Sequence, residues 1–219
     1  MTSSSQNSFS VCLTHDVDWV KKRHQCLTHF IRTGRFYHLK SLFSKENTYW
    51  NFNTIMDIEK SFNVHSTFFF LCQEGSGITP SFFPSPRSFR YSINNSEIKN
   101  ILNILEKGGW EVGLHASYNS YNSENLLSQE KTLLENVLGH KVSGVRQHHA
   151  RLSGTETWKL QQKVGFKYDC SLFYPQSNLP TTRTKIHYPF KDDFAVIPTT
   201  IMDTHLLKEH FSFENSWDF

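Results

Sequence analysis

The chain has 219 residues, a formal net charge of +3, 20% charged residues and 15% aromatic residues, among them 19 phenylalanines. Such an aromatic load excludes disordered, collagen-like and coiled-coil chains, and the length allows one large domain with its own core. The small net charge does not favour nucleic acid as a partner, and the longest apolar run, residues 66–72, is too short for a membrane helix.

The first half of the chain predicts two strands with helices after them. Residues 1–8 are expected to be a disordered tail and residues 9–219 a single domain. Residues 9–14 predict a strand, 19–43 one or two helices, 53–62 a helix, 64–71 a buried strand, and 75–90 a long loop. Because no secretory leader precedes them, we expect a cytoplasmic protein whose four scattered cysteines are free thiols.

The second half continues the alternation of strand and helix. A helix begins after Asn95 and ends at Gly108, and further helices are predicted at 123–138 and 153–164. Strands are predicted at 110–114, 142–145, 166–171 and 194–201. This alternation predicts one α/β domain whose parallel strands are joined by crossover helices.

Polar residues follow several of these strands, beginning with His15-Asp16-Val17-Asp18. In extended backbone Asp16 and Asp18 point the same way, so one can bind a metal ion while the other acts as a base near it. The plain alternative is a loop whose aspartates only cap a helix. Since parallel strands end on one face of the sheet, we expect this segment to meet the polar residues that follow the other strands.

Two later segments complete the candidate site. His115 and Asn119 are four residues apart, and one helical turn would bring them to one side as metal ligands; a purely structural histidine is the alternative. The run from Arg146 to Arg151 holds four ionisable side chains, of which Arg146 suits pairing with Asp16, while His148 and His149 suit contact with substrate. A solvated basic loop is the alternative there.

The sequence resembles the polysaccharide deacetylases, the NodB-homology proteins of carbohydrate esterase family four. The resemblance covers residues 9–205 and rests on Leu13–Asp18, Ser66-Thr67-Phe68-Phe69, Glu111–His115 and Val145-Arg146, in that order. It looks closest to a branch whose first motif is His-Asp-Val-Asp. It implies a distorted (β/α) barrel of about seven parallel strands that removes acetyl groups from a polysaccharide or an amino sugar.

The resemblance also implies roles for individual residues. Asp16 matches the catalytic base, Arg146 the arginine that orients it, and Asp18 and His115 two ligands of a divalent metal. Zinc is the expected metal, with cobalt, nickel or manganese as alternatives. Asn119 stands where the family has a second histidine ligand, and Tyr118, His148, His149 and Arg151 are expected to contact the carbohydrate.

Two departures from the family keep other readings open. Besides Asn119, the C-terminus looks truncated relative to the family, and His205 does not match the family's late acid histidine. The alternatives are a degenerate domain that binds glycans through side chains such as Trp110, Tyr118 and Tyr121, or a hydrolase of another C–N bond. The sequence does not indicate an oligomeric state.

Overall fold

The computed structural model describes residues 10–21, 30–31, 34–36, 47, 49–72, 91–173 and 185–203. The tail expected at residues 1–8, the loop expected at 75–90, Cys26, His205 and most of 19–43 lie outside these residues. Within them, no helix is both long and apolar enough to cross a membrane. Cys12, Cys72 and Cys170 are free thiols, as predicted.

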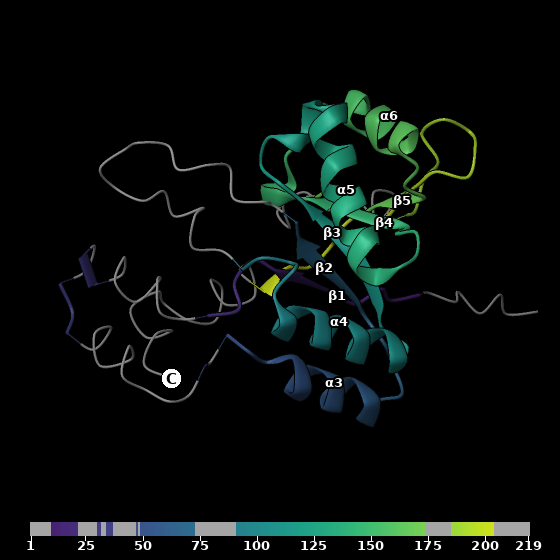
Figure 1. Cartoon of the computed structure of the whole chain (residues 1–219). Coiled ribbons are helices and arrows are strands. Elements are labelled where there is room, and N and C mark those ends of the chain that lie inside the picture. Colours follow the sequence, from purple (N-terminus) through teal and green to yellow (C-terminus); the bar gives the residue numbers. More distant parts are fainter. Residues whose placement is uncertain are drawn as a thin grey trace, which may run out of the picture.

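A parallel sheet of six strands, in chain order from β1 to β6, forms the centre of the described structure (Figure 1). The strands are β1 (Thr14–Val17), β2 (Thr67–Leu71), β3 (Glu111–Ala116), β4 (Gly144–Gln147), β5 (Tyr168–Asp169) and β6 (Ala195–Val196). Strands that are adjacent in the sheet are also consecutive in the sequence, as in a (β/α) barrel. The described sheet does not close between β1 and β6. The parallel α/β class is confirmed, with six described strands in an open sheet.

Within the part of the chain that the structure describes, four α-helices lie against the curved sheet in chain order (Figure 1). They are α3 (Phe52–Ser61), α4 (Ser96–Lys107), α5 (Glu124–Leu138) and α6 (Thr155–Val164). Side-chain caps explain the predicted starts of α4 and α5: the Asn95 side chain accepts the Glu97 N–H, and the Ser123 hydroxyl accepts the Leu126 N–H. The helices pack their apolar faces on the sheet, which leaves the other face of the sheet for polar groups.

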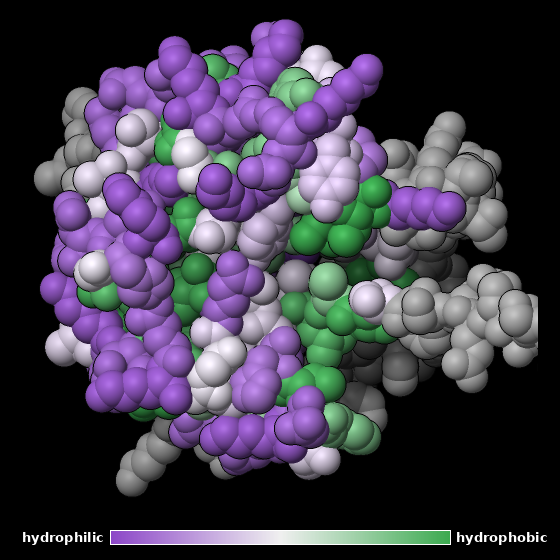
Figure 2. Space-filling view, turned by 90° about the vertical axis from the view of Figure 1, so that its right-hand side faces the viewer, coloured by the Kyte–Doolittle hydropathy of each residue, from purple (hydrophilic) through white to green (hydrophobic). Residues whose placement is uncertain are grey.

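The start of β1 differs from the prediction. The sequence favoured a strand at 9–14, but pairing with β2 begins only at Thr14, which aligns with Thr67. Val11, Cys12 and Leu13 precede the paired strand and are exposed. On the side of the molecule shown in Figure 2, apolar groups interrupt a largely hydrophilic surface.

The aromatic run of β2 divides between the two faces of the sheet. Phe68 and Phe70 belong to the core and contact Phe52 of α3, with ring centroids 5.9 Å apart in each pair. Phe69 lies on the opposite face, where the Arg146 guanidinium stands 4.8 Å above its ring. A Cβ on Gly113 of β3 would come within 2.5 Å of the Phe69 ring, so only glycine leaves room for this packing.

Candidate functional site

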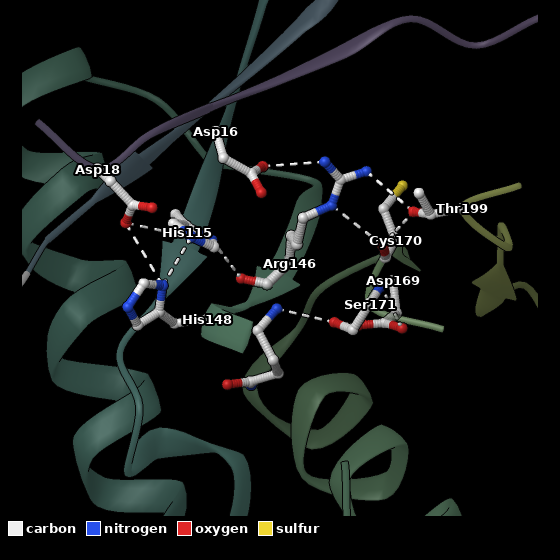
Figure 3. Close-up of polar contacts among 10 residues, drawn as sticks. Asp16, Asp18, His115, Arg146, His148, Asp169, Cys170, Ser171 and Thr199 are labelled. Carbon is white, nitrogen blue, oxygen red and sulfur yellow. Dashed lines mark hydrogen bonds and ion pairs between the residues drawn. The ribbon is translucent and has the colours of Figure 1, made fainter. Parts of the chain in front are cut away.

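The polar ends of the strands meet along a cavity of about 1080 Å³. Asp16, Asp18, His115, Arg146 and His148 all line it. Figure 3 shows these side chains pointing toward one another from β1, β3 and β4 and from the residues directly after β1 and β4. The expectation that they gather on one face follows from the parallel sheet, because all of its strands end at the same edge.

Asp16 and Arg146 form the ion pair that the sequence suggested. Arg146 Nη1 donates to Asp16 Oδ1 at 2.9 Å, and the guanidinium is otherwise fixed by backbone and hydroxyl oxygens (Figure 3). Its Nε donates to the Cys170 carbonyl at 3.0 Å, and its Nη2 donates to Thr199 Oγ1 at 3.3 Å. With three partners in three different segments of the chain, the guanidinium holds the Asp16 carboxylate in one orientation.

Asp18, His115 and His148 bring three potential ligand atoms within 4.8 Å of one another. Asp18 Oδ1 lies 3.6 Å from His115 Nε2 and 3.4 Å from His148 Nδ1. The two imidazole nitrogens are 3.2 Å apart. Both histidines are buried, while Asp18 is half-buried at the cavity.

The orientation of His115 is the one that metal-binding histidines adopt. Its Nδ1–H donates to the Arg146 carbonyl at 3.0 Å, because a carbonyl oxygen can only accept. This bond places the proton on Nδ1 and directs the Nε2 lone pair of the neutral ring toward Asp18 and His148. Such a second hydrogen bond, which fixes the tautomer, accompanies most histidine ligands.

The spacing of these three atoms fits a small divalent cation. A tetrahedral ion with zinc-type bonds of about 2.0–2.1 Å separates its ligand atoms by about 3.3 Å. The observed separations of 3.2, 3.4 and 3.6 Å lie around that value. One carboxylate and two imidazoles also form a donor set typical of catalytic zinc sites, in which a fourth position remains for water or substrate.

Asn119 does not join this group, contrary to the expectation from its spacing to His115. The helical turn that was to bring them together does not form, because His115 lies within β3 and the chain turns away after Ala116. Asn119 is exposed, precedes the short η2 helix (Ser120–Asn122) and does not line the cavity. The second imidazole comes from His148, which the sequence had suggested as a substrate contact.

The other predicted contacts divide between the cavity and its surroundings. His149 is exposed and lines the cavity next to His148, with their ring centroids 4.1 Å apart. Tyr118 and Arg151 pack against each other outside the cavity lining. Trp110 is buried and donates to Glu59 Oε2, so it is not available for stacking on a sugar.

A buried polar layer behind the site was not predicted. Gln147 lies between Arg146 and His148, and its N–H donates at 2.8 Å to Ser171 Oγ, which in turn donates to Asp169 (Figure 3). Asp169 lies inside the strand predicted at 166–171, and only the structure shows that β5 ends at this residue. Glu130 in the middle of α5 is also buried, and nothing in the sequence indicated a polar residue at this position of the interior.

Comparisons with known proteins find likeness in fold alone. No family model and no curated protein matches the chain. The fold resembles solved polysaccharide deacetylases and proteins of carbohydrate esterase family four. A protein from Mycobacterium smegmatis that is assigned as a polysaccharide deacetylase is 16% identical, with a TM-score of 0.49, over 86% of this chain and 58% of that one.

Two further structures illustrate the range of these similar folds. A pseudoenzyme of the same esterase family from Bacillus anthracis is 16% identical, with a TM-score of 0.43, over 73% of this chain and 42% of that one. A polysaccharide deacetylase from Bacillus cereus is 17% identical, with a TM-score of 0.38, over 68% and 71% of the two chains. The chain spans less than two thirds of the Mycobacterium smegmatis and Bacillus anthracis proteins. A similarity at this level concerns the fold and not the activity.

Proposed function

We propose that this chain is a metal-dependent hydrolase that removes acetyl groups from a polysaccharide or an amino sugar. The observation that carries the proposal is the group of Asp18, His115 and His148 at the spacing of metal ligands, next to the Asp16–Arg146 pair. The order of motifs in the sequence, which resembles that of the polysaccharide deacetylases, supports the same activity.

Asp18, His115 and His148 would hold the metal, with zinc as the expected ion and cobalt, nickel or manganese as alternatives. A metal bound there would polarise the acetyl carbonyl and lower the pKa of water. The choice of ion follows from the ligands, since imidazole suits the later first-row metals and a single carboxylate does not favour magnesium or calcium.

Asp16 would accept the proton of the attacking water. Its Oδ1 accepts a hydrogen bond from Arg146, which orients the carboxylate and leaves Oδ2 for the cavity. The carbohydrate would lie in the 1080 Å³ cavity, which is large enough for more than one sugar unit, with His149 as a polar contact. Tyr118 and Arg151 would reach only a sugar that extends beyond the described lining.

Metal content and acetate release test the two halves of this proposal separately. The wild type, purified without chelator, is expected to carry about one metal ion per chain, and Asp18→Ala very little. Asp16→Asn should retain the metal and lose acetate release from acetylated amino sugars. Retained metal with normal turnover in Asp16→Asn would refute the base assignment.

A degenerate glycan-binding domain and a hydrolase of a different C–N bond are separate outcomes of the same experiment. A wild type without metal, after resupply with zinc, cobalt and nickel, would contradict the enzyme. Glycan binding that persists in a chelator would then favour the binding domain. Metal binding without release of acetate from N- or O-acetyl sugars would favour the other C–N hydrolase.

A further inference from the structure

The chain that carries His148 into the site is strained immediately afterwards. His149 has φ 59° and Ala150 has φ 52°, so two consecutive residues with side chains adopt the left-handed region. Clashes of the Cβ atom make this conformation unfavourable for both. Such residues persist only where surrounding contacts hold them, and strain of this kind is concentrated at functional sites.

The next residue, Arg151, makes contacts that can hold the strained pair. Its guanidinium carbon lies 4.2 Å from the ring centroid of Tyr118 and 3.9 Å from that of Tyr121. Its Nη1 donates to the Tyr118 carbonyl at 3.2 Å and its Nη2 to Tyr121 Oη at 3.1 Å. Two aromatic faces and two hydrogen bonds therefore fix one half-buried guanidinium.

Both tyrosines belong to the turn that follows β3, the strand of His115. A buried side chain of α5 holds this turn in place: the Ser117 N–H donates to Glu130 Oε2 at 3.0 Å. The Ser120 hydroxyl contacts the Ser117 carbonyl at 2.7 Å and Gln147 Oε1 at 3.3 Å. Arg151 thus connects the segment of His148 to a buried and hydrogen-bonded support beside His115.

We propose that Arg151 is a positioning residue that holds the strained His149–Ala150 pair and thereby sets His148 at ligand distance from His115 and Asp18. Arg151 acts through His148, since it does not itself line the cavity among the described residues. Its effect on metal binding rests on the proposed function, whereas its hold on the segment does not. This role differs from the sugar contact that the sequence suggested for Arg151.

Hydrogen–deuterium exchange of the metal-free protein tests the hold directly. In Arg151→Ala, peptides that cover residues 147–152 should exchange faster, while those of β2 should be unchanged. Arg151→Lys should resemble Arg151→Ala, because an ammonium group cannot make both hydrogen bonds while stacking between two rings. Lys60→Ala is the matched control: it removes a cation 5.2 Å from the Trp110 ring, away from the site, and should leave 147–152 unchanged.

Zinc affinity, measured by competition with a chromophoric chelator, tests the consequence. Arg151→Ala should weaken binding by about 10- to 100-fold, the usual effect of losing a partner that orients a ligand. Adding Ala150→Gly should recover about 5-fold, because glycine adopts positive φ without the Cβ clash. A structural defect elsewhere would not be relieved by a glycine at this position.

The visible spectrum of the cobalt-substituted protein supplies a readout of the ligand set. Loss of His148 from the metal should change the cobalt bands of Arg151→Ala, and the added glycine should restore them in part. Unchanged exchange in Arg151→Ala would overturn the proposal, and so would faster exchange with unchanged zinc affinity and cobalt bands. A wild type that binds no metal would refute the proposed function, while the exchange data would still decide whether Arg151 holds the segment.

Discussion

Two carboxylates near the ends of parallel strands have opposite surroundings, and the first of them is Asp169 at the end of β5. Its carboxylate is fully buried and accepts hydrogen bonds from Trp158 Nε1, Gln161 Nε2, and the N–H and hydroxyl of Ser171. Burial raises the pKa of Asp169, and these hydrogen bonds oppose that rise. Four donors from three residues surround this carboxylate, which is typical of a structural carboxylate.

The second carboxylate, Asp18, faces imidazole nitrogens of His115 and His148, which are atoms that commonly bind metal ions. Its Oδ1 lies 3.4–3.6 Å from one nitrogen each of His115 and His148, longer than an ordinary hydrogen bond. The His115 nitrogen that faces Asp18 is Nε2, on the other side of the ring from the Nδ1–H that donates to the Arg146 carbonyl. The contrast shows that polarity and position at a strand end do not separate a structural carboxylate from a binding one, whereas the nature of the neighbouring atoms does.

Removal of the two carboxylates should therefore affect stability very differently. Asp169→Ala leaves four donors without their acceptor: the Trp158 indole N–H, the Gln161 amide, and the N–H and hydroxyl of Ser171. At 1–3 kcal/mol for each unpaired group, the free energy of unfolding should fall by about 4 kcal/mol. Asp18→Ala in the metal-free protein should change it by less than about 1 kcal/mol, because Asp18 is half-buried and water partly screens its contacts with the two histidines. Urea denaturation of both variants in a chelator checks the difference, and equal losses would contradict it.

Exchange of the third ligand sharpens the same comparison on the metal side. His148→Ala should weaken zinc binding by more than about 100-fold, because even partners that only orient a ligand contribute 10- to 100-fold. Asn119→Ala should leave the affinity unchanged, since Asn119 is exposed and does not line the cavity. The reverse result, with loss only in Asn119→Ala, would restore the ligand set suggested by the sequence.

Glu130 of α5 is a third carboxylate, which is buried, and only one of its two oxygens accepts a hydrogen bond from the described residues. Its Oε2 accepts the Ser117 N–H, while its Oε1 has no hydrogen-bond partner among the described residues. Burial raises the pKa of Glu130 from 4.5 to about 7, so the folded protein binds a proton there more tightly than the unfolded chain. Stability from this group is fully present below pH 4.5 and is lost as the pH rises through 7.

Substitution by glutamine isolates this effect. The free energy of unfolding of the wild type should fall by about 2 kcal/mol between pH 4.5 and 7.5 because of Glu130. This is somewhat less than the free energy that corresponds to the whole pKa shift of Glu130. Glu130→Gln, which is neutral throughout, should lack this part of the slope. Urea denaturation across the pH range measures both proteins, and parallel curves would contradict the role of Glu130. Comparison with the wild type cancels the contribution of Asp169, whose pKa is also raised.

Much of the fold follows from patterns along the chain. Asn95 and Ser123 mark helix starts, and the structure confirms the caps; glycines end α4, α5 and α6. The strand order was implied by the alternation of strand and helix, because short right-handed crossovers place consecutive strands side by side. The beginning of β1 was not predictable in this way, since it depends on where β2 offers backbone partners and not on the apolar content of residues 9–13.

The sequence alone determined which residues can do chemistry at this site: the pair Asp16 and Arg146, the ligand candidates Asp18 and His115, and a group of histidines after β4. Only the tertiary structure decided which of these meet. The register of β3 and β4 aligns His115 with Arg146. His148 follows directly after β4, and the left-handed turn at His149–Ala150 comes next. Spacing along the chain pointed to Asn119, but ligand geometry depends on distances between segments, which strand pairing and the contacts of turns establish.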